Sequence, residues 1–495
     1  MRLTKTKYVR FVKCPSMAWY FEFDPPQQIP SGSFALAGTD LGVLARNYFG
    51  TPAVLVDPDH LPTEPGLYAE YRFRHGDLLC DADLLRINED GSIAIYEVKS
   101  GSEKENYLDD VSFQYYVAVS AGWHVESITL LLLRKDYVYD GVSHDLKQLF
   151  FEEDVTDVAR DNLADVGTKV AAYLAMRKDN PPDAHPFCKS CKEDDCPFVE
   201  RCKALLGLPA TNSVYELPNA SYKTKNERMD EGIRTFADFR NSPRYAKASP
   251  AVKTVVDTAL GTDPLYLDKA SLAAYLGKVA FPAYFFDFET ESVPLPRYAG
   301  THPFQVIPFQ YSLHVMNSVD EDIQAVKERH EQYLGNGVDD PREELIKQMI
   351  RDLGDHGSII VYSQGTEHSI IERLAKEFPA YEKELLALAA RIYDLRGVFN
   401  CGPKKAPAIY HDAMKGRNTI KCVLPTFFPN DPELSYASLD TVHRGDEATT
   451  AYQRLGTLPE DEKEDLRKAM LRYCCLDTFA MVALYIRFLG FAGLR

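Results

Sequence analysis

The chain has 495 residues, of which 45% are hydrophobic and 26% are charged, so its composition is that of a globular protein and excludes wholesale disorder. Lysine and arginine total 56 and aspartate and glutamate total 73, which gives a net charge of −17 at pH 7. Such a balance argues against a protein that coats nucleic acid through bulk positive charge, but it is compatible with an enzyme that has a local basic channel.

The N-terminus, MRLTKTKYVRFVKC, lacks the apolar core of a signal peptide. The most apolar run, residues 128–133, is too short to span a bilayer. We therefore expect a cytoplasmic protein that is not embedded in a membrane.

At roughly 100–200 residues per domain, the length predicts two to four domains. Residues 1–205 and 276–495 both alternate strand-like runs with helical patterns, which predicts α/β folds. Residues 206–275 are polar and interrupted by prolines, and we interpret them as a helical connector. In the last part, helical periodicity predicts helices over 343–353 and 382–392.

A predicted hairpin carries the first group of charged side chains. Asp83 lies on the strand 78–86, and the turn NEDG leads into the strand 92–98, which ends in Glu97, a valine and Lys99. Because side chains alternate along a strand, Glu97 and Lys99 share one face. We expect the hairpin register to bring Asp83 beside them.

Two carboxylates in such a place can hold a hard divalent cation, and a lysine can position the attacking water and offset phosphate charge. The predicted helix that follows carries Asp110 and Gln114, whose amide could orient the lysine or a phosphate. The alternative interpretation is an exposed strand with a charged end, because these residues occur by chance in many hairpins.

These residues resemble the PD-(D/E)XK nuclease superfamily, and specifically its RecB-like branch. Asp83, Glu97 and Lys99 match the catalytic trio of that family, and Gln114 matches its downstream helix motif. The resemblance implies a restriction-endonuclease-like domain with metal-dependent nuclease activity.

The RecB-like branch often has a metal-binding histidine on its first helix. The corresponding segment here, GTDLGVLARNYFG, has no histidine and carries Arg46 instead. This departure leaves the metal one ligand short, and Glu70 is a candidate substitute.

A cysteine cluster ends the first part of the chain. Four thiols fall within fifteen residues and a fifth lies far upstream: Cys188, Cys191, Cys196, Cys202 and Cys14. In a reducing compartment such clustering favours a metal over disulfides. Thiolates suit both zinc and iron–sulfur clusters, so the spacing leaves these two open.

The cysteine pattern is similar to that of AddB-type nucleases and CRISPR-adaptation exonucleases, which carry one cysteine before the nuclease core and three after it. The resemblance implies a [4Fe–4S] cluster that clasps the ends of the domain together, with Zn²⁺ as the alternative. Cys14 fits the upstream ligand, and Cys191, Cys196 and Cys202 are the favoured downstream ligands, with Cys188 able to replace Cys191.

A second set of acidic residues lies in the last part of the chain. Asp287 and Glu289 alternate on the apolar strand YFFDFET and therefore face one side. Tyr473 and Asp477 are four residues apart and share one face of a predicted helix. Glu367 is placed near a helix start between them. Buried paired carboxylates repel each other unless a cation neutralises them.

This ordered set resembles the DEDD exonucleases of the RNase H-like fold. Asp287 and Glu289 match the first motif of that family, and Glu367 takes the place of its second-motif aspartate. Tyr473 and Asp477 match the Tyr-x3-Asp third motif.

The resemblance implies two-metal hydrolysis from a 3′ end, with two Mg²⁺ or Mn²⁺ ions about 3.5–4 Å apart on these four carboxylates. Asp394 is a candidate further ligand or a support behind the ligands. Tyr473, with an ordinary pKa near 10, would orient the attacking water rather than deprotonate it. The expected product is a 5′-nucleoside monophosphate.

The segment PLPRYAGTHPFQVIPFQYSLHV places His302, Gln305 and Gln310 among aromatic residues. These side chains could stack on or hydrogen-bond a terminal nucleotide, and a packed aromatic loop is an equally good interpretation.

The pattern of DFET, IPFQYSLH, YDL, IKCVLP and YCCLDT resembles a bacterial family that fuses a RecB-like iron–sulfur nuclease to a DEDD exonuclease. We therefore expect a dual nuclease acting on DNA, more than on RNA, in repair or defence. The alternatives are a first domain that only binds nucleic acid beside an active exonuclease, and a protein in which both sites have decayed. The sequence indicates no protein partner.

Overall fold

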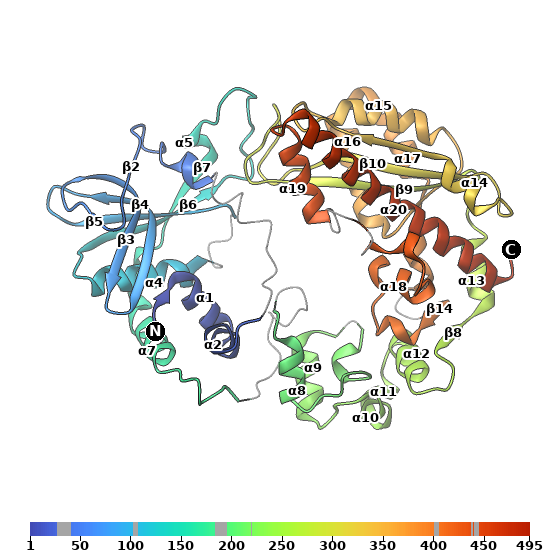
Figure 1. Ribbon diagram of the computed structural model, residues 1–495, viewed down its shortest axis with the longest axis horizontal. Helices are drawn as coiled ribbons and strands as arrows, with labels where there is room; N and C mark the ends of the chain where they lie inside the picture. The colour runs from blue at the N-terminus through green and yellow to red at the C-terminus, as the bar shows by residue number, and fades with distance from the viewer. Residues whose placement is uncertain are drawn as a thin grey trace. The chain divides into compact units, whose positions relative to one another are not determined.

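The computed structural model describes residues 1–26, 41–101, 107–183, 196–218, 220–399, 405–436, 439 and 445–495. They form two compact units of mixed α/β structure (Figure 1). The first unit comprises Met1–Leu206 and Ser292–Gln305, and the second comprises Gly207–Glu291 and Val306–Arg495. Residues 207–275 of the predicted connector therefore belong to the second unit.

A seven-stranded mixed sheet organises the first unit, in the order β2-β3-β4-β5-β6-β7 with β1 pairing parallel to β4. The strands are β1 Leu3–Thr4, β2 Val54–Leu55, β3 Gly66–His75, β4 Leu78–Ile87, β5 Ile93–Lys99, β6 Val125–Leu133 and β7 Phe150–Asp154. The pairs β3/β4, β4/β5 and β6/β7 are antiparallel, whereas β5 and β6 are parallel. The predicted hairpin is thus confirmed as β4 and β5.

Helices cover this sheet: α1 Lys5–Lys13, α2 Pro15–Phe23, α4 Leu108–Ser120, α5 Leu146–Leu149, α6 Thr156–Asp161, α7 Leu163–Leu174 and α8 Val199–Leu205. Helix α4 connects the parallel strands β5 and β6, as a parallel pair requires. Its ring Phe113 stacks on Tyr8 of α1 with centroids 4.7 Å apart, and both side chains are fully buried. This contact fixes α1 against the helix that follows the hairpin.

The segment Ser292–Gln305 completes the first unit although it lies between two strands of the second. Its backbone pairs with Tyr139: Thr301 O accepts from Tyr139 N at 3.0 Å, and Gly300 N donates to Tyr139 O at 2.8 Å. Phe304 packs on the same hydrophobic cluster as Phe150.

The second unit contains a five-stranded sheet in the order β11-β10-β9-β12-β13. The strands are β9 Ala283–Ser292, β10 Val306–Met316, β11 His330–Leu334, β12 Ser358–Val361 and β13 Ile392–Asp394. Strands β10 and β11 are antiparallel, and β12 runs parallel to both β9 and β13. A separate antiparallel pair joins β8 Leu265–Leu267 to β14 Ile409–His411.

The helices of this unit are α9 Tyr222–Asp230, α10 Phe236–Asn241, α11 Pro243–Ala246, α12 Pro250–Ala259, α13 Lys269–Leu276, α14 Ile323–Glu328, α15 Arg342–Leu353, α16 Gln364–Glu377, α17 Glu382–Ala389, α18 Ile420–Phe427, α19 Gly445–Leu455 and α20 Glu460–Ala492. Short 3-10 turns lie at Val214–Glu216, Pro379–Tyr381, Leu395–Phe399, Asp412–Met414 and Pro432–Leu434.

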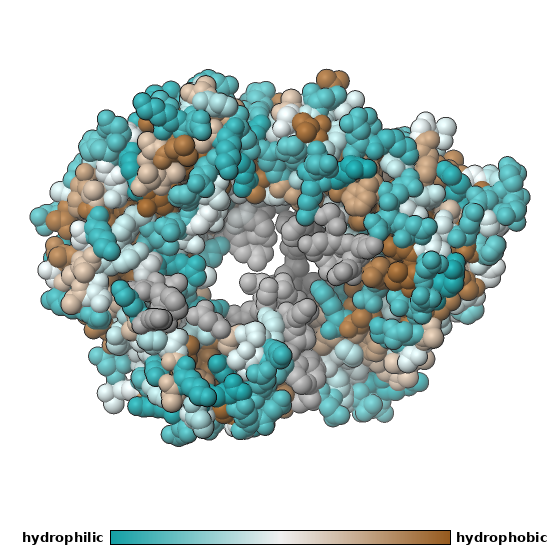
Figure 2. Space-filling view, turned by 180° about the vertical axis from the view of Figure 1, so that it is seen from behind, coloured by the Kyte–Doolittle hydropathy of each residue, from teal (hydrophilic) through white to brown (hydrophobic). Residues whose placement is uncertain are grey.

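Helix α20 is the one helix among the described residues that is long and apolar enough to cross a membrane. However, 72% of its most apolar window is buried inside the protein, as in the core helix of a folded domain. The face of the molecule in Figure 2 is mainly hydrophilic, with apolar residues scattered over it.

Two elements differ from the sequence-based expectation. The helix predicted over 382–392 ends at Ala389, and Ile392 instead begins β13, because pairing with the buried strand β12 satisfies its backbone. The expected helical connector likewise contains β8, whose partner β14 lies more than a hundred residues away in the chain.

Candidate active sites

Strand β9 positions two of the predicted carboxylates in the second unit. Asp287 and Glu289 are two residues apart on the strand, so their side chains point to the same face. Their carboxylate oxygens and the thiol of Cys474, on α20, all lie within 4.8 Å of one another. The sheet and the last helix therefore meet at this acidic strand.

Two further carboxylates reach the same place from other elements. Glu367 lies in the first turn of α16, and Asp477 lies on α20. Removal from water raises the pKa of Asp287 well above its usual range, and the neighbouring charges of Asp477, Glu289 and Glu367 raise it further. The four carboxylates predicted from the sequence are thus brought together.

Burial is the main cause that raises the pKa of each of the other three carboxyl groups. The pKa rises to about 8 for Glu289, through burial and the charge of Asp477, and to about 7 for Glu367, through burial and the charge of Asp394. Burial raises the pKa of Asp477 to about 6, although Tyr436 and Lys421 oppose that rise. Like charges held this close are the arrangement that a bound cation neutralises.

The strongest sign of a missing partner is on Glu367, whose side chain is buried. Its Oε2 atom has no hydrogen-bond partner among the described residues. A buried unpaired carboxylate oxygen is costly unless it binds something. Oxygen donors are the ligands that Mg²⁺ and Mn²⁺ prefer, so this donor set fits divalent cations of that kind.

Two tyrosines and a lysine border the carboxylates. Tyr436 donates a hydrogen bond from its hydroxyl to Asp477 Oδ1, and its ring centre is 6.3 Å from that of Tyr473. The Lys421 ammonium lies 5.5 Å from the Tyr436 ring centre and 6.0 Å from that of Tyr473. Burial and the charges of Asp477 and Glu289 raise the pKa of Tyr473, so its hydroxyl keeps its proton.

The sequence reasoning missed Tyr436 and Lys421 as site residues. Lys421 lies in the IKCVLP segment, which the resemblance had picked out as a whole. Tyr436 precedes Asp477 by 41 residues and belongs to no recognisable motif, so only the fold places it.

Asp394 supports the start of the helix that carries Glu367. Its Oδ1 accepts hydrogen bonds from the backbone N–H groups of Ser363 at 3.0 Å and Arg396 at 2.9 Å. Ser363 has a φ of +94°, so this bond holds a left-handed turn before α16. Of the two roles predicted for Asp394, this geometry favours the support behind the ligands.

The three polar residues proposed to contact a nucleotide are divided between the two units. His302 and Gln305 belong to the first unit, where His302 Nδ1 lies 3.0 Å from the carbonyl oxygen of Tyr137. Gln310 belongs to the second unit, is fully buried, and donates to the Met470 carbonyl at 3.0 Å. These contacts favour the packed-loop interpretation.

In the first unit, the hairpin brings its predicted residues together as expected. Asp83 Oδ2 accepts from the backbone N–H of Val98 at 2.7 Å, and Lys99 Nζ lies 2.8 Å from Glu97 Oε1. Burial, followed by the charge of Glu97, raises the pKa of Asp83 to about 7. Gln114, on α4, donates to Glu97 Oε2.

A second lysine, which the sequence reasoning did not consider, also occupies this site. Lys5 Nζ, at the start of α1, lies 2.6 Å from Glu97 Oε1, the same oxygen that Lys99 contacts. Burial alone would raise the pKa of Glu97, but Lys5 and then Lys99 outweigh it and lower that pKa. Lys99 also pairs with Asp110.

Arg46, in the segment where the histidine is expected, forms an ion pair with Glu70. Arg46 Nη2 lies 3.5 Å from Glu70 Oε1. The neighbours of Glu70 on β3 pair with the neighbours of Asp83 on β4, so these two residues lie opposite each other. Glu70 has a φ of +59°. Glu70 is thus beside the site, but it is paired with Arg46.

Three of the five predicted cluster cysteines, Cys14, Cys196 and Cys202, lie in described parts of the chain and are all buried. Cys188 and Cys191 lie outside the described residues. The thiol of Cys14 accepts from the backbone N–H of Met17 at 3.3 Å and so caps α2.

Aromatic contacts join the two ends of the first unit near these thiols. Phe198 packs on Tyr20 and Phe21 of α2, with ring centroids 5.0 and 5.1 Å apart. Burial, then the charge of Cys202 and more weakly that of Cys14, raises the pKa of Tyr20. Cys14 and Cys202, from the two ends of the unit, therefore both lie near Tyr20.

A family model described as a domain of unknown function, DUF2779, matches residues 284–419. The match includes Asp287, Glu289 and Glu367, but it stops before Tyr473 and Asp477. No curated protein matches the chain.

Proposed function

We propose that the protein is a metal-dependent nuclease whose second unit hydrolyses DNA from 3′ ends by two-metal chemistry. The observation that carries this proposal is the cluster of four carboxylates with the unpaired Glu367 Oε2. A RecB-like nuclease site in the first unit, built around Asp83, Glu97 and Lys99, completes the proposal.

The sheet order supports the finer fold assignment of the second unit. Three successive strands, β9, β10 and β11, are followed on the other side of β9 by the parallel strands β12 and β13. The acidic residues lie on the central strand β9, at the start of α16 and on the last helix α20, an arrangement that supports an RNase H-like exonuclease. In the first unit, the β3-β4-β5 meander with a helical crossover to β6 supports a restriction-endonuclease-like fold.

The carboxylates of Asp287, Glu289, Glu367 and Asp477 would hold the cations. When bound, two Mg²⁺ or Mn²⁺ ions supply an activated water and stabilise the leaving 3′ oxygen. Tyr473 keeps its proton and therefore orients the water as a hydrogen-bond donor rather than acting as a base. Tyr436 holds Asp477 in place, and Lys421 offsets negative charge beside it.

A second candidate function applies to the first unit alone, which would bind nucleic acid without cutting it. Lys5 and Lys99 place two ammonium groups within 2.8 Å of Glu97 Oε1, the oxygen that a metal ion would use. These two ammonium groups compensate the charge of the carboxylates without a metal ion. The same charges suit contact with a phosphate backbone.

The proposed iron–sulfur cluster would have a structural role, in which it links the two ends of the first unit. Cys14, Cys196 and Cys202 would supply three of its ligands, and the remaining ligand falls outside the described residues. Purified protein should be brown and contain iron, and a colourless preparation that contains zinc instead would contradict this assignment.

Nuclease assays separate these functions. Labelled single- and double-stranded DNA and RNA are incubated with Mg²⁺ or Mn²⁺ and with wild type, Asp287→Ala or Lys99→Ala. Asp287→Ala should abolish release of mononucleotides from 3′ ends, and full retention of that activity would show the assignment to be wrong. If Lys99→Ala leaves all cleavage unchanged but removal of the cysteines abolishes binding, the first unit is a binding module. Asp355→Ala, at a side chain that is 98% exposed in the second unit, is the matched control.

A further inference from the structure

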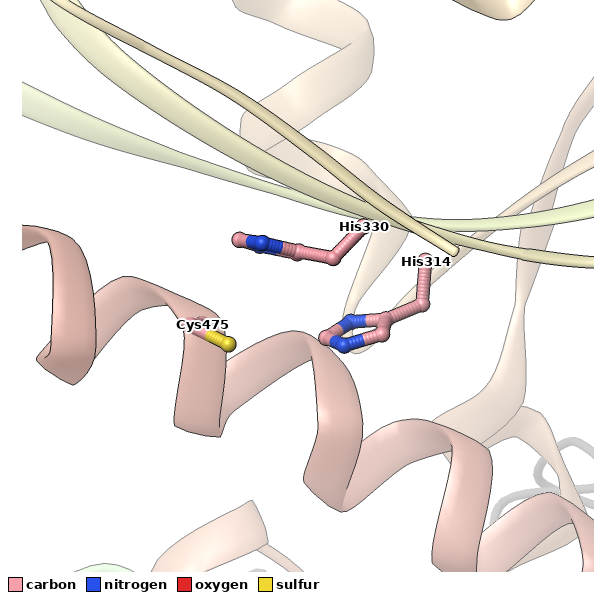
Figure 3. Close-up of side chains that lie close together, drawn as sticks. All are labelled: His314, His330 and Cys475. Atoms are coloured by element: carbon pink, nitrogen blue, oxygen red, sulfur yellow. The ribbon is translucent and has the colours of Figure 1, made fainter. Parts of the chain in front are cut away.

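A second group of side chains with atoms that can bind metal lies on a different face of α20. His314 of β10, His330 of β11 and Cys475 of α20 point toward one another (Figure 3), and their ligand atoms all lie within 4.8 Å. Cys475 is two residues from both Tyr473 and Asp477, and at about 100° per residue it faces away from them. The group is therefore separate from the carboxylate cluster.

Hydroxyl groups fix both imidazole rings. Thr478 Oγ1 lies 2.9 Å from His314 Nδ1, and Ser312 Oγ lies 2.8 Å from His330 Nε2. The two hydroxyls are 2.7 Å apart and so form one network. Each ring thus has one nitrogen held by a hydroxyl and a second nitrogen left to bind something else.

The free nitrogen of His314 is the observation that points to a ligand. The side chain is fully buried, and its Nε2 has no hydrogen-bond partner among the described residues. A buried polar atom of this kind is costly unless it is paired. Metal-binding histidines commonly have their other ring nitrogen held by a hydrogen bond, as here.

We propose that His314, His330 and Cys475 bind a zinc ion that fastens α20 to the edge of the five-stranded sheet. Two imidazoles and a thiolate are a donor set that Zn²⁺ prefers, with bonds of about 2.0–2.3 Å that small side-chain rotations would close. The hydroxyl network leaves His314 Nε2 and His330 Nδ1 open, and the ion would bind through these nitrogens. Water completes the tetrahedral shell.

The charge around the group is compatible with this ion. The nearby Lys327 ammonium pairs with Glu433 at 2.9 Å, which reduces its repulsion of a cation. Removal of the Cys475 proton on binding leaves a net charge of +1 on the ion and its ligands.

A zinc ion here would set the position of α20 against β10 and β11. The opposite face of the same helix turn carries Tyr473 and Asp477, so the ion would hold these residues in register with the acidic strand. The inference does not depend on the proposed nuclease function, because it rests only on the three ligands and their hydroxyl partners.

Metal content of the full-length protein tests the site. Zinc and iron are measured by mass spectrometry in wild type, Cys475→Ser, His314→Gln and the control Cys422→Ser, which changes a half-buried thiol of the same unit. The two ligand variants should each lose one equivalent of zinc, with iron unchanged, and the control should lose none. Equal zinc in all four proteins would overturn the proposal.

A measurement on wild type alone covers the case in which the variants fail to fold. The protein is treated with a chelator, supplied with Zn²⁺ or Mg²⁺, and alkylated, and each modified cysteine is identified by peptide mass spectrometry. Zn²⁺ should slow the alkylation of Cys475 by about tenfold or more, and leave that of Cys422 unchanged. An equal rate for Cys475 with and without Zn²⁺ would exclude the site.

Discussion

Glu367 is the single residue that most favours a bound cation in the second unit. Its carboxylate is buried at the start of α16, and one oxygen has no partner among the described side chains. Under the proposed assignment, a glutamate stands where DEDD exonucleases have an aspartate, so its carboxylate reaches one methylene further from the helix. Asp394 holds the turn before α16 by accepting a hydrogen bond from Ser363, and this fixes the start of the helix that carries Glu367.

Replacing Asp287 by Asn should separate catalysis from stability. We expect the rate of 3′-end hydrolysis to fall by about 10³-fold or more, because losing a ligand of a catalytic metal costs several kcal/mol. The melting temperature in the presence of a chelator should stay the same or rise, since one of four repelling carboxylates is removed. Rates and melting curves are compared with those of Asp355→Asn, and a lower melting temperature for Asp287→Asn would mean that lost activity reflects unfolding.

The stability of the chelator-treated protein should depend on pH. The folded pKa is raised to about 6 for Asp477, about 7 for Glu367 and about 8 for Glu289, each above its ordinary value. A carboxyl group with a raised folded pKa stabilises the fold fully below its unfolded pKa, and that contribution is lost as pH rises through the folded value.

The free energy of unfolding of the metal-free protein should therefore fall between about pH 4 and pH 8, by a total on the order of a few kcal/mol. Saturating Mn²⁺ should remove most of this fall, because the cation neutralises the ionised carboxylates. A metal-free protein that becomes more stable over this range would contradict the cluster geometry. Urea denaturation at each pH, with and without Mn²⁺, measures both trends.

At the scale of elements, α20 contributes side chains to both groups of candidate ligands in the second unit. One turn of this helix carries Tyr473 and Asp477 toward the acidic strand and Cys475 toward the histidines. The helix is buried along most of its C-terminal half, and its neighbour Gln310 on β10 is bonded to its backbone at Met470. Packing of this helix therefore fixes both groups of side chains.

Met470→Ala should destabilise the second unit by about 2–5 kcal/mol, because it leaves a cavity beneath a fully buried side chain. The bond from Gln310 goes to the backbone of this residue and is unaffected by the substitution. Lys468→Ala, at a side chain that is 66% exposed on the same helix, should change stability by no more than about 0.5 kcal/mol. A similar small effect of Met470→Ala in urea denaturation would show that the helix packs differently.

At the scale of the whole molecule, the chain does not divide into units in simple order. The segment Ser292–Gln305 leaves the acidic strand β9, completes the first unit and returns as β10. Its side chains Leu295 and Phe304 pack on the cluster that includes Tyr48 and Phe150. A protein cut after residue 206 would therefore lack part of its first unit.

Phe304→Ala should destabilise the first unit by about 1–3 kcal/mol through the loss of half-buried aromatic area. Hydrogen exchange should show faster opening of β6 and β7, with the strands β9 to β13 unchanged. Val142→Ala, at a side chain that is 84% exposed in the same unit, is the control. Unchanged exchange in Phe304→Ala would show that this segment adds nothing to the first unit.

The net charge of −17 does not arise mainly from the two candidate sites. Only a few of the 73 acidic residues form the two candidate sites, so most of the negative charge lies elsewhere. The proposed contact with nucleic acid would use local positive charges, such as Lys5 and Lys99 beside Glu97. Binding to nucleic acid through such contacts should weaken as salt is raised.

The sequence by itself determined the residues that alternation and helix periodicity can align. Asp287 with Glu289, Tyr473 with Asp477, and the β4–β5 hairpin all follow from spacing within one element or one tight turn. Strand β13 could not be foreseen, because the pattern of 382–392 fits a helix. Only pairing with β12 makes Ile392 part of a strand.

Only the tertiary structure decided which distant residues share a site. Lys5 reaches Glu97 across 92 residues, and Tyr436 reaches Asp477 across 41, because separate elements pack there. His314, His330 and Cys475 likewise come from two strands and a helix. Local patterns record which way a side chain points along its own element, whereas contact between elements depends on packing, which no spacing in one segment encodes.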